Sequence, residues 1–289
     1  MHETTTRRAH LAGLAGAAAT AMLPRLARAQ ARDAARGAQP NATRAPAASA
    51  AADIPPEGIG RGIRHVSYSD QGGRPDGVQV MASRGYLYVG HMFSDGVTVL
   101  DARDPRELKP VRYFSTPFTR THHLQTAGDY LLLANGANLA RSQRYDNSRA
   151  YFENTLADSI AKREPFRAGL SIFAIDRNPA APREIAFLEM PGIGVNRLWW
   201  VGGRYAYVSA HFDGFTDHIL CIVDLKNITK PELVSRWWLP GMNRAAGETP
   251  TNPLGKRYAL HHMIVAGDRG YAAWRDGGFT VHDVRDASS

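Results

Sequence analysis

GVTVLD at residues 96–101 decides the fold, because the chain repeats the pattern three more times. The run alternates small and β-branched residues, ends in Asp, and is followed by a turn that contains proline, which is typical of a strand and its exit. The other copies are GLSIFAID at 169–176, ILCIVD at 219–224 and GFTVHD at 278–283. A run led by tyrosine precedes each copy: GYLYV at 85–89, DYLLL at 129–133, RYAYV at 204–208 and GYAAW at 270–274.

The spacing of these runs indicates a β-propeller. Tyr86, Tyr130, Tyr205 and Tyr271 are 44, 75 and 66 residues apart, and a base period near 44 with insertions has the length of one four-stranded blade. The third unit extends to strands at 195–201, 204–209, 220–224 and 233–239, and the first to strands at 78–82, 86–90, 97–101 and 111–115. The second unit has its last strand at 185–189.

About three and a half blades are visible in the sequence, since the fourth unit stops at residues 283–289 without a last strand. A closed ring needs about four to eight blades. Either a strand near residues 62–68 completes a small ring, or the chain is a truncated copy of a longer propeller, which we favour. Residues 58–289 are predicted to form this all-β domain, with an insertion at 137–168 and a short helix only near 151–162.

The strand that ends in Asp, with the turn after it, resembles the LVIVD-repeat family of β-propellers. The residues that carry the resemblance are 97–105 (VTVLDARDP), 220–225 (LCIVDL) and 279–286 (FTVHDVRD), and the likeness extends over residues from about 63 to 289. The resemblance implies the fold and says little about activity, because propellers support unrelated functions.

The N-terminus is typical of an export signal. Arg7 and Arg8 precede the small apolar stretch at 12–23, and Ala27-Arg28-Ala29 is a cleavage pattern, so residues 1–29 are predicted to be a signal peptide of the twin-arginine type. The stretch is too short for a membrane span. Residues 30–57, rich in Ala, Arg and Pro, are predicted to be a disordered linker. The mature protein is therefore expected to be periplasmic or secreted, with no membrane span.

The charge distribution argues against nucleic-acid binding. Residues 1–50 carry +5 of the formal net charge of +8, so the excess of basic residues belongs largely to the leader. The one cysteine, Cys221, excludes an intramolecular disulfide and is interpreted as a buried thiol in a strand.

Histidines recur at matched positions of the repeat. His122-His123 begins the first strand of the second unit and His261-His262 begins that of the fourth, while His91 and His211 follow the second strands of units one and three. In an antiparallel meander these positions lie at one end of the blade, near the axis. Imidazole is the commonest protein ligand for Zn, Cu and Fe, so the six are candidate ligands of one transition metal ion. The resembling family has small residues where the pairs stand.

Four further residues are candidate ligand-binding groups. Asn196 and Arg197 occupy in the third unit the place of the histidine pairs, and Asp95 and Asp213 lie in turns after second strands, where they would orient the imidazoles. Asp101, Asp176, Asp224 and Asp283 recur at one repeat position and are predicted to shape turns. The insertion at 137–168 and the long connection at 240–258 are predicted to lie over the histidines.

Two functions remain open from the sequence. The first is an exported propeller that binds a small molecule, through a histidine-bound Cu, Fe or Zn ion, as a sensor or as a metal-dependent oxidoreductase or hydrolase. The alternative is a non-enzymatic scaffold that binds a partner protein or a cell-surface polymer.

Overall fold

The described residues of this protein, seen in a computed structural model, are 42–43, 61–138, 165–253 and 255–287. The chain divides into two compact units, Met1–Gln39 and Pro40–Ser289, and every described residue belongs to the second. Within the described ranges the structure is all-β: it has strands and one 3-10 turn, η2 (Arg244–Ala246), but no α-helix. The prediction of an all-β domain is confirmed. The helix expected near 151–162 lies outside the described residues.

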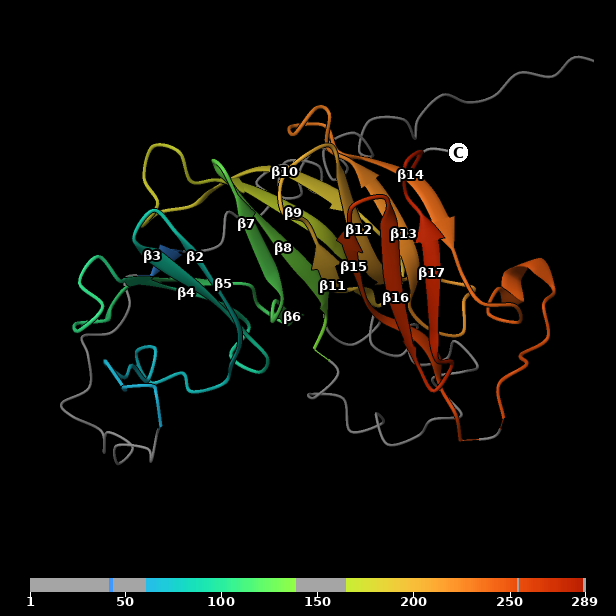
Figure 1. Cartoon of the computed structure of the whole chain (residues 1–289), viewed down its shortest axis with the longest axis horizontal. Helices are drawn as coiled ribbons and strands as arrows, with labels where there is room; N and C mark the ends of the chain where they lie inside the picture. The colour runs from blue at the N-terminus through green and yellow to red at the C-terminus, as the bar shows by residue number, and fades with distance from the viewer. Residues whose placement is uncertain (1–41, 44–60, 139–164, 254, 288–289) are drawn as a thin grey trace, which may run out of the picture. The chain divides into compact units, whose positions relative to one another are not determined.

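The strands follow one another as antiparallel meanders, which we call groups 1 to 4 (Figure 1). Group 1 contains β2 (Gly77–Ser83), β3 (Tyr86–His91), β4 (Gly96–Asp101) and β5 (Lys109–Ser115), with β1 (Ala42–Thr43) added beside β5. Group 2 contains β7 (Leu124–Ala127), β8 (Tyr130–Ala137), β9 (Gly169–Ala174) and β10 (Arg183–Glu189), preceded by β6 (Thr119–Arg120). Group 3 contains β11 (Gly194–Trp199), β12 (Tyr205–His211), β13 (Ile219–Asp224) and β14 (Glu232–Trp237). Group 4 contains β15 (Tyr258–Ala266), β16 (Arg269–Arg275) and β17 (Phe279–Asp283).

The predicted strands of the first and third units are confirmed, each starting and ending within two residues of its expected place. Turn chemistry explains this precision. Arg84 and Gly85 have φ of 54° and 77°, the left-handed pair that a two-residue hairpin turn requires between β2 and β3. Residues 62–68 form no strand, so the strand that might have completed a small ring is not formed there.

Two glycines let groups 2 and 3 meet in one sheet. β8 and β11 pair only at Gly136 and Gly194. A Cβ at Gly194 would stand 2.6 Å from the Asn135 carbonyl oxygen, and one at Gly136 would stand 2.8 Å from that of Val195. Side chains at these positions would force the backbones apart, so glycine permits the contact.

The strand register corrects one repeat assignment. Tyr86 pairs with Asp101 and Tyr205 with Asp224, but in group 4 it is Arg269 that pairs with Asp283, and Tyr271 lies two residues further along β16. The spacing of the four tyrosines therefore overstated the similarity of group 4 to the other groups. The turn at residues 267–268 sets the start of β16, and a shift of two residues leaves Tyr271 on the same face of its sheet.

Asp176 is likewise not equivalent to the other three aspartates, because Tyr130 pairs with Ala174. The predicted turn role holds for those three. Asp101, Asp224 and Asp283 each accept the backbone N–H two residues ahead and bind an arginine side chain.

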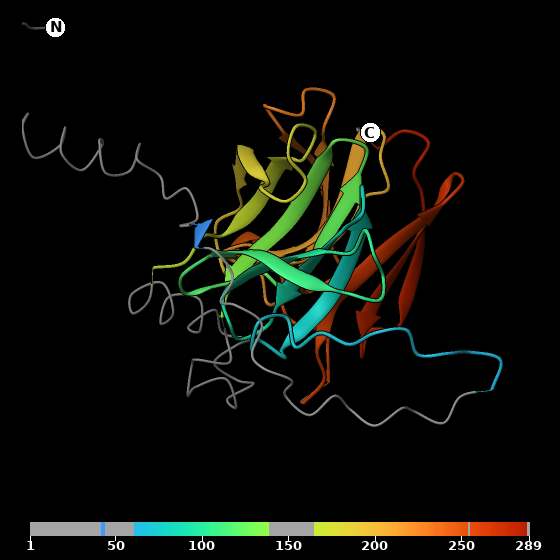
Figure 2. The ribbon, with the colours of Figure 1, turned by 90° about the vertical axis from the view of Figure 1, so that its left-hand side faces the viewer.

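Buried side chains fill the spaces between successive groups. Figure 2 shows the ribbon of these groups with group 1 toward the viewer. Phe114 of group 1 lies 5.4 Å from Phe173 of group 2, between ring centroids, and Trp237 of group 3 lies 5.2 Å from Trp274 of group 4. Each sheet face that meets the next group is thus apolar. The first strands of groups 3 and 4 carry Arg197 and the pair His261-His262, and His122-His123 directly precedes the first strand of group 2.

Candidate functional site

Two histidine pairs from distant parts of the sequence meet beside an arginine. We call His122, His123, His261, His262 and Arg197 the imidazole cluster. The ring centroids of His123 and His262 lie 5.5 Å apart, those of His122 and His123 6.2 Å, and those of His261 and His262 6.4 Å. The repeat positions alone predicted that the pairs would converge, and the structure brings them together.

Strand register explains the convergence. His262 lies opposite Ala273 on β16, and His123, just before β7, accepts with its carbonyl the N–H of Ala134 on β8 (2.9 Å). The two imidazoles therefore occupy equivalent places on the first strands of groups 2 and 4. Arg197 lies on β11, the first strand of group 3, which contacts both β7 and β15.

A glycine on the neighbouring strand leaves room for His122. A Cβ at Gly90 of β3 would stand 2.5 Å from the Thr121 carbonyl oxygen and 2.9 Å from the His122 carbonyl carbon. The backbone of β3 thus approaches the segment that carries the first histidine pair, and any larger residue at position 90 would displace it.

Burial keeps the cluster imidazoles neutral. Burial, and then the positive charges of Arg120 and Arg197, lower the pKa of His122 from 6.5 to about 2. Burial and then Arg197 lower the pKa of His123 to about 2, and the same two causes, with Arg275, lower that of His261 to about 4. For His262 the direction is also downward, chiefly through burial and then Arg197. At neutral pH each ring therefore carries one N–H donor and one acceptor nitrogen.

Several polar atoms of the cluster are buried without a protein partner. His123 accepts the Leu198 N–H on Nδ1 (3.3 Å), so its proton sits on Nε2. His122 Nδ1, His262 Nε2 and Arg197 Nε have no hydrogen-bond partner among the described residues. A buried polar atom left unpaired costs about 1–3 kcal/mol, so this arrangement favours an external partner for them.

Arg197 brings positive charge to the cluster. It is half-buried, and burial, followed by the charge of Arg275, lowers the pKa of its guanidinium. In the part of the chain that the structure describes, no carboxylate forms an ion pair with Arg197. Asn196, its neighbour, is buried and accepts a hydrogen bond from Arg120 Nη2 (3.3 Å) on Oδ1. The cluster thus combines one guanidinium, that of Arg197, with four neutral imidazoles.

Two predicted ligands, His91 and His211, do not join the cluster. The ring of His91 is held between Asp76 Oδ1 (2.9 Å) and Thr98 Oγ1 (2.8 Å). His211 accepts the Ile193 N–H on Nδ1 (3.2 Å) and donates from Nε2 to the Phe215 carbonyl (3.2 Å). Both nitrogens of each ring are engaged, so these histidines stabilise turns.

The two predicted carboxylates also have other positions. Asp95 is buried and accepts from Asn138 Nδ2 (2.6 Å), whereas Asp213 is exposed in the turn after β12. Within the described ranges, neither forms a hydrogen bond with a cluster imidazole. Asp76 is the carboxylate that orients His91. Burial tends to raise the pKa of Asp76, but the Ser94 hydroxyl and the N–H groups of Phe93 and Ser94 together lower it to about 2.

Sequence reasoning missed a second polar group near the cluster. Asp217 is fully buried and binds both His218 Nδ1 (2.8 Å) and Arg257 Nη2 (2.9 Å). His218 lies close enough to His122 to lower its pKa. The adjacent Asp-His dipeptide in the sequence was the available signal.

The donor set does not assemble a three-ligand metal site. Among the described residues, no three His, Cys, Asp or Glu side chains are placed to hold one metal ion. A cation at the cluster would also meet the positive charge of Arg197, which, in addition to burial, already lowers the pKa of His122 and His123. The predicted Cu, Fe or Zn ion is not tested by this arrangement and stays a prediction for elemental analysis.

No helix in the described part of the chain has the length and apolar character to cross a membrane.

Comparisons with known proteins give distant likeness only. No family profile matches the chain, and no curated protein matches it. The chain is similar to the crystal structure of the computationally designed Ika4 protein, at 13% identity and a TM-score of 0.42 over 71% of this chain and 89% of that one. It is also similar to a proposed 6-phosphogluconolactonase from Bacteroides uniformis, at 12% identity and a TM-score of 0.47, over 72% of this chain and 50% of that one. With scores below 0.5, no argument rests on these likenesses.

Proposed function

We propose that this protein is an exported β-propeller of four-stranded blades that binds a small anionic ligand at the imidazole cluster. The meander order of groups 1 to 3, each of four consecutive strands, supports the blade assignment. The arginine pair and cleavage pattern at the N-terminus support export to the periplasm or beyond. The proposal includes the LVIVD-like repeat as the origin of the architecture.

One observation carries the binding proposal: Arg197 has no described carboxylate partner and lies among buried, neutral imidazoles that have unpaired nitrogens. A guanidinium in a partly buried place is stabilised by a counter-charge, and a planar carboxylate or a phosphate can accept two parallel bonds from it. Neutral imidazole N–H groups add donors without adding charge. A monoanion or dianion of a few heavy atoms fits this donor set.

Titration calorimetry with acetate, oxalate and inorganic phosphate tests the proposal. At least one anion should bind the wild-type protein, and Arg197→Gln should weaken that binding at least tenfold, the loss of one charge-assisted pair. Arg106→Gln, which removes an exposed arginine from the turn before β5, is the matched control and should leave the affinity unchanged. If none of the three anions binds, or if both variants weaken binding equally, the anion site is refuted.

The metal hypothesis has its own support, because neutral imidazole is the form that ligates a transition metal. Elemental analysis of protein exported through its own signal should find stoichiometric Cu, Fe or Zn if a metal is resident, and His123→Gln with His262→Gln should remove it. If the protein holds no metal but binds an anion, small-ligand binding without a metal is the function that remains. If neither is bound, the interaction scaffold becomes the better account.

A further inference from the structure

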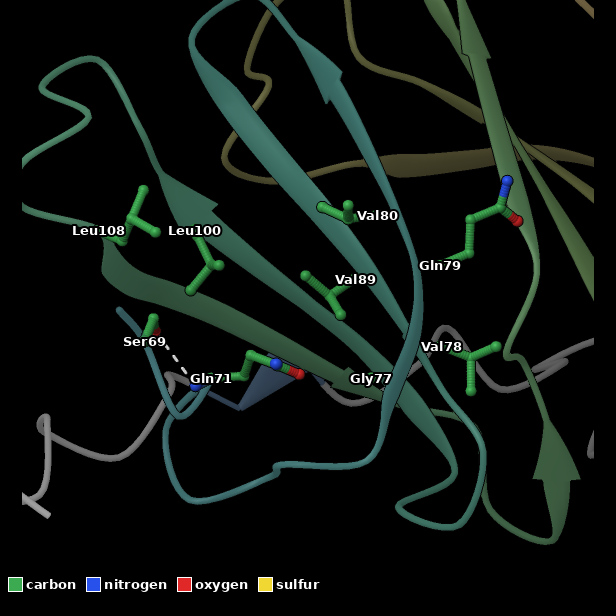
Figure 3. Close-up of a pocket in the computed structure, with 9 residues that line it drawn as sticks. All are labelled: Ser69, Gln71, Gly77, Val78, Gln79, Val80, Val89, Leu100 and Leu108. Atoms are coloured by element: carbon green, nitrogen blue, oxygen red, sulfur yellow. Dashed lines mark hydrogen bonds between the residues drawn. The ribbon is translucent and has the colours of Figure 1, made fainter. Parts of the chain in front are cut away.

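A pocket lies on the face of group 1 that points away from group 2. Tyr88 and Val99 pack against group 2, and successive side chains of a strand point to opposite faces. Their neighbours Val89 and Leu100 therefore point the other way, where a pocket of about 260 Å³ is formed. Four apolar side chains make up its wall: Val80, Val89, Leu100 and Leu108 (Figure 3).

The other side of this pocket is a segment that is held at both ends. We call residues 67–76 the strap. At its start, Ser67 Oγ donates to the Pro105 carbonyl (2.6 Å). At its end, the Asp76 carboxylate accepts two backbone N–H groups of the turn after β3 (2.7 Å each). Because both ends are bonded to group 1, the pocket is formed before a ligand enters it, which is usual for small-molecule sites.

Gln71 of the strap lines the pocket and has two unfavourable features (Figure 3). Its φ is 58°, in the left-handed region that residues other than glycine rarely adopt. Its Oε1 atom is buried, and within the described ranges it has no hydrogen-bond partner. Backbone strain and unpaired buried polar atoms occur most often where a protein binds or reacts with a ligand. A hydrogen-bond donor on a bound molecule would satisfy this oxygen.

A glycine leaves room for the Gln71 carboxamide. A Cβ at Gly77 would stand 2.5 Å from Gln71 Oε1 and 2.6 Å from Val89 Cγ1, so a larger residue there would displace the carboxamide. The last torsion of a glutamine side chain has a broad energy minimum. A small rotation about it therefore turns Oε1 toward a donor in the pocket.

We propose that this pocket binds a small uncharged molecule that is apolar except for one hydroxyl group, which donates a hydrogen bond to Gln71 Oε1. The described residues that line the pocket include no charged side chain, so an ion would lose its hydration there without compensation. An apolar cavity of about 150 Å³ is large enough for benzene, and the larger pocket here accepts a ring with a substituent. The site shares no residue with the imidazole cluster, and the proposal is independent of anion binding there.

NMR titration of the isotope-labelled full chain with phenol, toluene and benzoate tests the site. Phenol at up to about 10 mM, a range that covers millimolar affinity, should shift the backbone amide signals of Val89 and Leu100. Benzoate should not shift them, because its charge is not compensated in the pocket. Signals that benzoate shifts around Arg197 would report the anion site of the imidazole cluster instead. The proposal is overturned if phenol does not bind, if its shifts lie elsewhere, or if benzoate binds the pocket as tightly as phenol.

Gln71→Met tests the hydrogen bond, because methionine has the length of glutamine but lacks the amide oxygen. The change should weaken phenol binding about tenfold and leave the affinity for toluene, which has no hydroxyl group, unchanged. Val201→Met, at a 66% exposed valine outside the pocket lining, is the matched control and should alter neither affinity. Equal effects of Gln71→Met on the two ligands, or no effect on phenol, would refute the hydrogen bond.

A second variant keeps the test decisive if Gln71→Met does not fold. Val80 is 55% exposed and lines the pocket, so Val80→Phe should fold and fill part of the space. The dispersion of its amide signals will verify the fold. Val80→Phe should abolish the phenol-induced shifts, and phenol binding that persists unchanged in this variant would place the ligand outside the pocket and overturn the proposal.

Discussion

Acid is expected to destabilise this protein between about pH 7 and pH 5, because His122 and His123 are neutral in the folded state and protonated in the unfolded chain. Each is 1% exposed, and burial lowers the pKa of each from 6.5 to about 2. A histidine whose pKa is lowered in the folded state makes its full contribution to the free energy of unfolding above pH 6.5. That contribution is lost as the pH falls below 6.5, where only the unfolded state takes up the proton.

The size of this loss of stability follows from how far the pH lies below 6.5, the pKa of histidine in the unfolded chain. One pKa unit is worth about 1.4 kcal/mol, so at pH 5, roughly 1.5 units below 6.5, each imidazole lowers the free energy of unfolding by about 2 kcal/mol. The two together account for about 4 kcal/mol. This is a large part of the ~5–15 kcal/mol that stabilises a typical domain.

Urea unfolding at pH 7.5, 6.5, 5.5 and 5.0 measures this loss directly. The double variant His122→Gln, His123→Gln is expected to be less stable at pH 7.5, because it changes buried packing. Its free energy of unfolding should nevertheless fall by about 4 kcal/mol less than that of the wild type between pH 7.5 and 5.0. Val66→Gln, at a 51% exposed valine with no titratable group, is the control and should leave the pH dependence unchanged. An identical pH dependence in the double variant and the wild type would refute the reasoning.

Three further outcomes are expected. Trp274→Ala should lower the free energy of unfolding by about 3–5 kcal/mol in urea titrations, because the indole is fully buried and donates to Thr280 Oγ1 (2.8 Å). A loss below about 1 kcal/mol would contradict the assigned packing. Asp76→Asn should cost about 2–3 kcal/mol, since the carboxylate accepts from Ser94 Oγ and two backbone N–H groups, and a neutral effect would show that these bonds are not made. Cys221 should resist thiol reagents at pH 8 in the folded protein and react fully in denaturant, because its side chain is 0% exposed and burial raises the pKa of the thiol. Rapid reaction of the thiol in the folded protein would place Cys221 at the surface.

The sequence allowed the strands of groups 1 and 3 to be predicted closely because their signals are local. Alternating β-branched residues and the glycine at position 85 act over a few residues, and they do so before any long-range contact forms. The tyrosine repeat failed in group 4 for a related reason. Strand register there is set by a turn at 267–268, whose effect on pairing is not visible in a match of Gly-Tyr dipeptides.

The histidine pairs could be predicted to meet because equivalent repeat positions become equivalent places in space. The roles of His91 and His211 could not. Their nitrogens are occupied by Asp76 and by the Ile193 N–H, which are 15 and 18 residues away in sequence. A hydrogen bond depends on tenths of an ångström, and the sequence specifies no such distance.

By itself, the sequence determined the all-β class and the order of the strands, because these depend on short-range backbone preferences and on burial of one strand face. Only the tertiary structure decided which imidazoles keep an unpaired nitrogen and which sheet faces remain exposed. Those features arise where segments distant in sequence pack, and there the presence or absence of one neighbour, such as a carboxylate beside Arg197, changes the chemistry of the site.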